Sequence, residues 1–401
     1  MISITGKYAN ADIFTDQVED DAIAQITDLC NNVASEGSAI KIMPDVHPGN
    51  GCTIGTTMTI TDRVVPNLVG VDISCGILCT CLGEVEIDLP RLDHQIKRSI
   101  PSGFYSRKTV HSRADNVDLT ELRCAEKLTK PIDSARYQLG TLGGGNHFIS
   151  IEENELGVKY LLIHSGSRNI GKQVAEYYQK LAIDECRKNT DVMRAEIIRT
   201  NKENGTPDLI QSQLDAMPRL VEDLAYLHRE SQSFHDYLHD MTIMSRYAAL
   251  NRNIIAEEII RNTPELTGST YDWFQTVHNY IDPATMTLRK GAISAQEGEM
   301  VTIPMNMRDG SIIAVGKGNP DWNYSAPHGA GRIMGRREAK RILDFETFRQ
   351  SMQGIYSSSV FPGTIDESPM VYKPMEDILK YIGDTVEIQS IIKPVYNFKA
   401  Q

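Results

Sequence analysis

The sequence predicts an α+β fold, with central β-sheets surrounded by helices and a helical insertion at about residues 172–262. Three observations support this prediction. Short β-branched runs separated by Gly and Pro fill the first 150 residues, long segments of helical periodicity follow, and extended segments return toward the C-terminus. No internal repeat, low-complexity tract or clear linker divides the 401 residues, so a single domain over residues 1–401 is the simplest expectation.

The elements expected in the first half are strands joined by tight turns. Runs rich in apolar and β-branched residues bounded by Gly or Pro predict strands at Cys52 to Ile60, Leu68 to Ile73 and Tyr137 to Leu142. A continuous apolar strand is expected to end at His164. Because strand ends open into Gly-rich turns, we expect functional side chains on these loops.

The second half begins with two long helices. Apolar residues at helical spacing predict them at Gln173 to Lys188 and Phe234 to Arg261, with a polar loop at Thr200 to Pro207 between them. The remaining elements follow in chain order: strands at Gly291 to Ile303 and Ser311 to Val315, a helix at Gly335 to Met352, and an extended tail from Thr385 to Phe398.

Composition excludes several protein classes. Hydrophobic residues make up 41% and charged residues 23%, as in an ordinary globular protein. Neither a run of eighteen apolar residues nor a basic-then-apolar leader is seen, so the expected location is the cytoplasm, without a membrane span. Seven cysteines without regular spacing suit reduced thiols. A net charge of −12 argues against non-specific coating of nucleic acid, although a local basic cleft could still bind RNA ends.

Asp72 and Cys75 lie together in the motif Val69 to Gly76. We interpret this motif as an apolar strand that ends in a Gly-containing turn, which can aim both side chains at one point. A thiolate beside a carboxylate suits Mn²⁺, Zn²⁺ or Fe²⁺, and the sulfur could bridge two ions. The structural alternative is a buried Cys that packs as a small hydrophobe beside a turn-capping Asp.

Histidines stand in four further loops. His147 follows three glycines whose backbone N–H groups can approach a phosphate, and His164 opens a segment with hydroxyls and an Arg. His278 follows aromatic and apolar residues, and His328 lies between a Pro and the run Gly329 to Arg332. His328 has the context of a nucleophile beside an Arg that neutralises phosphate. Each histidine taken alone also has an ordinary structural interpretation, as a core, turn or surface residue.

One more segment carries ionisable side chains. Asp45 and His47, in Met43 to Gly49, are interpreted either as supporting partners of the site or as turn residues. Taken together, these groups in Gly-rich loops predict one site.

At these residues the sequence closely resembles the RtcB family of RNA-splicing ligases. The matching motifs are MPDVHPGNGCTIGTTM at 43–58, VGVDISCG at 69–76, QLGTLGGGNHFI at 138–149, IHSGSRNIG at 163–171, RKGAISA at 289–295 and SAPHGAGR at 325–332. The resemblance implies a single RtcB-like catalytic domain. It also implies a GTP- and Mn²⁺-dependent ligase that joins RNA 2′,3′-cyclic phosphate or 3′-phosphate ends to 5′-hydroxyl ends, in RNA repair or tRNA splicing.

The resemblance also implies roles for individual residues. His328 matches the histidine that becomes guanylylated, and Cys75 would be shared between two Mn²⁺ ions. The implied metal ligands are Asp72, Cys75, His147, His164 and His278. The implied nucleotide contacts are Asn146, Asn306, Ser311, His328, Gly329, Ala330, Gly331, Arg332, Tyr372 and Lys399.

Three positions depart from the family pattern. Ser150 stands where a Glu that helps hold guanine is usual, Asn50 replaces a usual Lys, and Asn306 replaces a common Ser. These departures bear on guanine preference and RNA contacts more than on catalysis. Two other functions are weighed: a metal-dependent RNA-end phosphodiesterase or cyclic phosphatase without joining activity, and an RNA-end-binding or ribosome-associated factor with a vestigial site. The physiological RNA and the need for an activating protein partner are left open.

Overall fold

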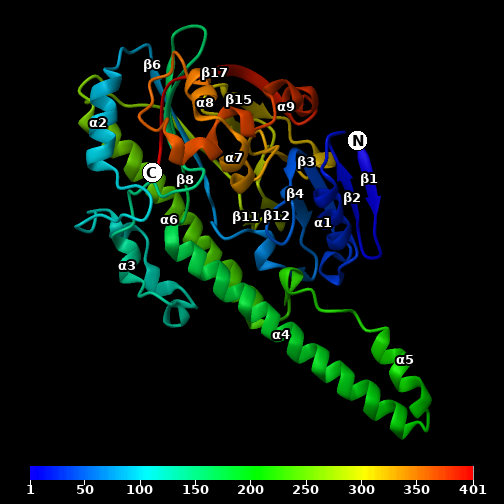
Figure 1. Cartoon of the computed structure of the whole chain (residues 1–401). Coiled ribbons are helices and arrows are strands. Elements are labelled where there is room, and N and C mark those ends of the chain that lie inside the picture. The colour runs from blue at the N-terminus through cyan, green and yellow to red at the C-terminus, as the bar shows by residue number, and fades with distance from the viewer. Residues whose placement is uncertain (401) are drawn as a thin grey trace.

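Two large β-sheets organise the chain in the computed structural model, which describes residues 1–400 (Figure 1). The first has six strands, antiparallel except for the pair β2 and β3. In spatial order its strands are β1 (Ile2–Thr5), β2 (Asn10–Ile13), β3 (Ala39–His47), β4 (Ile54–Thr59), β12 (Thr287–Lys290) and β11 (Tyr280–Asp282).

The second sheet has seven antiparallel strands and carries most of the site. In spatial order they are β10 (Trp273–Val277), β6 (Gly76–Gly83), β8 (Lys159–Ser165), β7 (Phe148–Glu153), β17 (Val386–Lys399), β15 (Gly310–Gly316) and β14 (Met300–Asn306). Two short pairs complete the strands: β13 (Ala292–Ser294) with β16 (Ser325–Pro327), and β5 (Arg63–Val64) with β9 (Leu227–His228).

Helices surround these sheets, as the α+β prediction requires (Figure 1). They are α1 (Asp20–Cys30), α2 (Leu89–Ser99), α3 (Asp133–Arg136), α4 (Arg168–Glu203), α5 (Ile210–Asp215), α6 (Gln232–Asn262), α7 (Arg336–Ile342), α8 (Phe345–Ser351) and α9 (Met375–Ile382). No helix in residues 1–400 combines the length and apolar character that crossing a membrane requires.

The helical insertion is built on α4 and α6. The side chain of Ser231 accepts the backbone N–H of Phe234 and so caps the start of α6. Buried residues at helical spacing on α6, such as Tyr237, Met241 and Met244, pack in the same apolar cluster as Val174 of α4. Beyond this cluster α4 projects from the body, and α5 lies near its far end (Figure 1). Both predicted helices are confirmed, and α4 is longer than expected.

Two predicted strands are wrong. Leu68 to Ile73 is an irregular, partly buried segment, because Gly70 has a φ of +96° and the backbone turns away from any ladder. Leu68, Val69 and Ile73 pack in the core instead, while Val71 is exposed. Tyr137 to Leu142 is also irregular: Gly140 has a φ of +71°, and its backbone N–H donates to the side chain of Asn251 on α6.

Other boundaries differ from the prediction more modestly. The expected helix at Gly335 to Met352 is two helices, because Asp344 accepts the backbone N–H of Thr347 and starts α8 anew. The segment Gly291 to Ile303 contains a turn between β13 and β14. The strand within Cys52 to Ile60 and the extended tail are confirmed as β4 and β17.

Candidate active site

Four neighbouring strands of the seven-stranded sheet bring the predicted metal ligands to one end. Gly76 at the start of β6 pairs with Val277 at the end of β10 and with Ser165 at the end of β8. Phe148 at the start of β7 pairs with His164 of β8. Cys75, His278 and His147 are the chain neighbours of these paired residues, so strand order and register place all of them together. The motif with Asp72 and Cys75 precedes β6 rather than ending a strand, which corrects the sequence interpretation.

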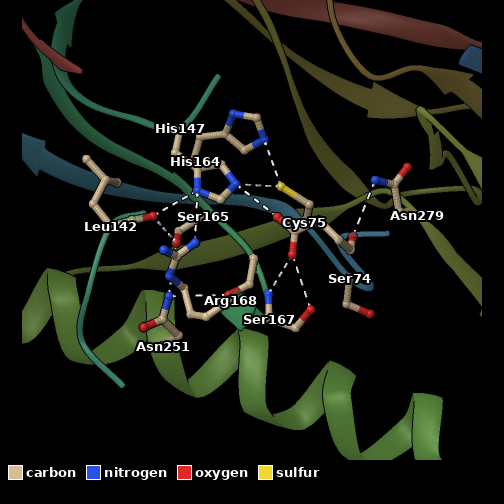
Figure 2. A network of polar contacts seen from close by, with 12 residues as sticks. Ser74, Cys75, Leu142, His147, His164, Ser165, Ser167, Arg168, Asn251 and Asn279 are labelled. Atoms are coloured by element: carbon tan, nitrogen blue, oxygen red, sulfur yellow. Dashed lines mark hydrogen bonds and ion pairs between the residues drawn. The ribbon is translucent and has the colours of Figure 1, made fainter. Parts of the chain in front are cut away.

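The five side chains form two overlapping groups that share Cys75. Asp72, Cys75 and His147 make one group, and Cys75, His164 and His278 make the other; within each group the ligand atoms lie within 4.8 Å of one another. The Cys75 Sγ lies 3.3 Å from Nε2 of His147 and 3.3 Å from Nε2 of His164. Figure 2 shows the sulfur facing both imidazoles.

The electrostatics of this cluster suit a cation. Burial lowers the pKa of His164 and of His278 well below the ordinary value, so both imidazoles are neutral and offer lone pairs. The Nε2 atoms of His164 and His278 face each other at a distance of 3.4 Å. Burial raises the pKa of the Cys75 thiol. Burial alone would raise the pKa of Asp72, but hydrogen bonding and charge from His147 hold it at about 2. The donor set fits a transition metal, because a cation would accept the lone pairs of the converging carboxylate, thiol and imidazole groups.

Supporting contacts orient the cluster. The ring of His147 donates from Nδ1 to the carbonyl of Leu142 at 2.8 Å, which directs Nε2 at the cluster, 3.0 Å from Oδ2 of Asp72. Oδ1 of Asp72 accepts the backbone N–H of Ser167 at 2.9 Å. Beneath these loops the buried guanidinium of Arg252 donates to the carbonyls of Ser74 and Ser165 at 2.9 and 2.8 Å. These bonds fix the loops relative to α6, as the neighbouring Asn251 does in Figure 2.

His328 lies at the far end of a row of histidine rings. The ring centroids of His147 and His164 are 5.3 Å apart, those of His164 and His278 are 5.2 Å apart, and those of His278 and His328 are 4.8 Å apart. His328 directly follows β16, and its Nδ1 lies 2.6 Å from Oδ2 of the fully buried Asp45 on β3. His328 therefore lies between Asp45 on β3 of the six-stranded sheet and His278, which follows β10 of the seven-stranded sheet.

Gly331 makes the close approach between these segments possible. Its φ is +76°, and a Cβ there would lie 2.2 Å from the backbone oxygen of Asp45. A side chain at this position would therefore push the His328 loop away from the Asp45 strand.

A cavity of about 350 Å³ joins both parts of the site. Four of the predicted metal ligands line it: Asp72, Cys75, His164 and His278. All ten predicted nucleotide residues line it as well: Asn146, Asn306, Ser311, His328, Gly329, Ala330, Gly331, Arg332, Tyr372 and Lys399.

Several of the predicted nucleotide residues already have protein partners. The hydroxyl of Tyr372 donates to Glu367 at 2.9 Å, and Lys399 pairs with the same carboxylate. Burial alone would raise the pKa of Glu367, but the nearby cations hold it at about 2. Asn306 is bonded within its own turn, where its amide donates to Asp309 at 2.7 Å. Asn146 is exposed at the rim.

Sequence reasoning missed Glu152, Asn397 and Arg336, which also line the cavity. Glu152 lies two residues after Ser150 on β7, so both side chains share one face of the strand, and the Ser150 hydroxyl donates to Glu152 at 2.8 Å. The alternation of side chains along a strand is the sequence signal that could have placed Glu152 on the same face as Ser150. Burial raises the pKa of Glu152 to about 7. Asn50, the other departure, has its carbonyl bonded by Lys290 and does not line this cavity.

Fold and site together define a class of protein: an α+β enzyme whose cavity combines a carboxylate-oriented histidine with a Cys/His/Asp cluster suited to metal ions. Comparison with known proteins makes this class specific. The family model described as "tRNA-splicing ligase RtcB" matches residues 29–127 and 118–400. The chain therefore belongs to the RtcB family of RNA ligases.

Curated relatives agree along most of the chain. The protein named RNA-splicing ligase RtcB from Escherichia coli K12 is 30% identical over 388 residues, covering 89% of this chain and 88% of the relative. The tRNA-splicing ligase RtcB of Archaeoglobus fulgidus is 26% identical, covering 91% and 88%. The RNA-splicing ligase RtcB of Mycobacterium tuberculosis is 26% identical, covering 84% and 91%.

Proposed function

We propose that this protein is a GTP- and Mn²⁺-dependent ligase that joins RNA 2′,3′-cyclic phosphate or 3′-phosphate ends to 5′-hydroxyl ends through a guanylylated His328. The observation that carries the proposal is the contact of 2.6 Å between Nδ1 of His328 and the buried carboxylate of Asp45, in the cavity that also holds the Cys/His cluster. Hydrogen bonding of Nδ1–H to Asp45 leaves the Nε2 lone pair as the nucleophile.

The proposed reaction begins at His328. Its Nε2 attacks the α-phosphorus of GTP, the P–O bond to pyrophosphate breaks, and a phosphoramidate to GMP forms. Asp45 keeps the Nδ1 proton in place and stabilises the charge that develops on the imidazole. An RNA 3′-phosphate, formed by hydrolytic opening where the end is cyclic, then takes GMP from His328. The 5′-hydroxyl of the second RNA finally displaces GMP and forms the phosphodiester.

The proposed metal ligands are Asp72, Cys75, His147, His164 and His278. The sharing of Cys75 between two groups of convergent donor atoms supports two bound ions. Mn²⁺ held there would offset phosphate charge and orient the reacting oxygens. This donor set would also bind Zn²⁺, which stands above Mn²⁺ in the affinity order, so metal availability would decide which ion is bound.

The proposed nucleotide contacts are the ten cavity residues named above, and Glu152 joins them. Four buried polar atoms of the cavity wall have no hydrogen-bond partner within residues 1–400: Nη1 of Arg332, Oε2 of Glu152, Oγ of Ser311 and Oδ1 of Asn397. The last three come from the neighbouring strands β7, β15 and β17. Guanine carries an N–H and an amino group on one edge, which a carboxylate can accept together. Glu152 therefore supports guanine recognition despite Ser150.

The decisive experiment follows the label of GTP carrying radioactive α-phosphate. The native chain, His328→Ala and a control, His235→Ala on an exposed position of α6, are incubated with Mn²⁺ and separated under denaturing conditions. Label that stays on the native and control chains and is absent from His328→Ala is expected. Absence of label from the native chain with metal bound would sink the ligase mechanism and favour an RNA-end phosphodiesterase or cyclic phosphatase.

We further propose that residues 1–401 act as one catalytic domain in the cytoplasm, on the RNA ends of repair or tRNA splicing. Cys75 belongs to both ligand groups, and all seven cysteines, which lie within residues 1–400, are free thiols. A reducing compartment would keep such a site intact.

A further inference from the structure

A second groove, of about 640 Å³, lies beside the end of α2. Four cationic side chains line it, and within the described residues no carboxylate does. The loop that forms its other wall exposes two aromatic rings: Phe104 is 107% exposed and Tyr105 is 79% exposed. We call this surface the basic–aromatic groove: Lys97, Arg98, Tyr105, Arg107 and Lys108 line it, and Phe104 adjoins it on the same loop.

The cationic side chains of the groove differ in whether they already have a partner within the protein. Lys97 is paired with Asp93 at 2.9 Å, and Arg107 donates to the carbonyl of Leu139 at 2.9 Å. The exposed Arg98 and Lys108 have no ion pair or side-chain hydrogen bond to any residue within 1–400. The groove thus offers free positive charge beside exposed rings on a chain whose net charge is −12. Proteins bind single-stranded nucleic acid by combining cationic side chains that contact the phosphates with aromatic rings on which the bases stack.

The groove is joined to the active site by backbone hydrogen bonds. The N–H of Leu142 donates to the carbonyl of Pro101 at 2.9 Å, and the N–H of Gly103 donates to the carbonyl of Gly143 at 2.8 Å. Gly143 begins the loop that carries His147. The groove therefore adjoins the His147 end of the histidine row, opposite His328, where the GMP would be attached.

We propose that the basic–aromatic groove binds the single-stranded RNA that leads to the reacting end. Bases stack on Phe104 and Tyr105, while Arg98 and Lys108 contact phosphates. This inference rests on the proposed function for its reacting end. Both RNA substrates share the sugar–phosphate chemistry that the groove recognises, so two separate RNAs, one with a 3′-phosphate and one with a 5′-hydroxyl, are the probes.

The test measures binding of each fluorescent single-stranded RNA to the full chain by anisotropy at several salt concentrations. Replacing Phe104 and Tyr105 together by Ala is expected to weaken binding by about tenfold or more. Replacing Arg98 and Lys108 together by Ala is expected to reduce the slope of log affinity against log salt by about 1.4, because each phosphate contact on a single strand contributes about 0.7.

Matched controls lie elsewhere on the surface. Trp273→Ala removes a ring that is 57% exposed at the end of β10 away from His278. The double replacement of Arg194 and Lys202 by Ala removes two exposed cations from the projecting part of α4. Both control variants are expected to bind RNA as the native chain does.

The outcomes separate this inference from the proposed function. The groove variants are expected to take label from GTP at the native rate in the absence of RNA. Native-like binding of both RNAs by the groove variants would overturn the inference while leaving a labelled His328 intact. Weakened binding in variants of a chain that is never labelled would support the groove and contradict the ligase mechanism. Loss confined to one of the two RNAs would support the groove and identify its strand.

Discussion

The carboxylate of Asp45 holds His328 by two contacts to the same oxygen. Oδ2 of Asp45 lies 2.6 Å from the ring Nδ1 and accepts the backbone N–H of His328 at 3.1 Å. These residues are far apart in the sequence, and the contact joins β3 to the loop after β16. It fixes both the tautomer and the direction of the imidazole, which is the arrangement a histidine nucleophile needs.

Asp45→Asn is expected to slow guanylylation of His328 by roughly a thousandfold, because the amide would donate to Nδ1 and move the proton to Nε2. The measurement is the rate at which label from GTP enters the chain. The control is Asp12→Asn, which removes a half-buried carboxylate paired with Lys41 outside the site. Native-rate labelling of a folded Asp45→Asn chain would show that Asp45 does not orient the nucleophile.

The shared cysteine predicts a graded loss of metal. Cys75→Ala is expected to abolish binding of both proposed Mn²⁺ ions, because Cys75 belongs to both ligand groups. His147→Ala and His278→Ala are each expected to retain one ion, because each residue belongs to one group. Elemental analysis of the purified chains checks this order, with His235→Ala as the control. Equal metal content in the Cys75 and His147 variants would contradict a bridging sulfur.

Glu152 predicts a pH dependence of stability. Burial raises its pKa to about 7 in the folded chain, above an unfolded value of about 4.3. Its contribution to stability is therefore complete below the unfolded pKa and is lost as pH rises through about 7. The loss amounts to about 4 kcal/mol.

Denaturant unfolding of the native chain and Glu152→Gln at pH values across this window isolates that contribution. The native free energy of unfolding is expected to fall relative to that of the variant as pH rises toward 7. Parallel curves for the two chains would show that the Glu152 carboxyl is ionised throughout.

Adjacent glycines before Asn146 predict different costs of substitution. Gly143 has a φ of +87°, and a Cβ there would lie 1.9 Å from the guanidinium of Arg168. Gly143→Ala is expected to reduce the free energy of unfolding by about 1–2 kcal/mol or more. Gly144→Ala should change it by less than about 0.5 kcal/mol, because its nearest neighbour, Cα of Gly103, would be 3.8 Å from the new Cβ. Equal losses in the two variants would contradict this local packing.

Local pattern explains which parts of the fold were predictable. The helices α4 and α6 follow from apolar residues at helical spacing, and β8 follows from its uninterrupted apolar run. Leu68 to Ile73 has the same apolar character as a strand, yet it is irregular because Gly70 turns the chain, and Leu68, Val69 and Ile73 are still buried in the core. An apolar run reports burial, and only hydrogen-bond partners decide whether the buried segment is a strand.

The residues of the candidate site that could be predicted are those whose type and spacing indicate a chemical role. The five proposed ligands and His328 stand out because Cys, Asp and His occur in Gly-rich loops beside apolar strands. Glu152 and Asn397 did not stand out, because a polar residue in a strand is usually on the solvent face. Their role depends on which faces of β7 and β17 line the cavity.

The sequence by itself determined the membership of the RtcB family, the α+β class, the helical insertion and the residues that we propose as metal ligands and nucleophile. Only the tertiary structure decided that Cys75 stands between His147 and His164, that Asp45 meets His328, and that Glu152 enters the cavity. The physical reason is the separation along the chain over which each kind of information acts. Side-chain periodicity acts over a few neighbouring residues, whereas the order and register of strands are set by burial and hydrogen bonding between segments far apart in the chain.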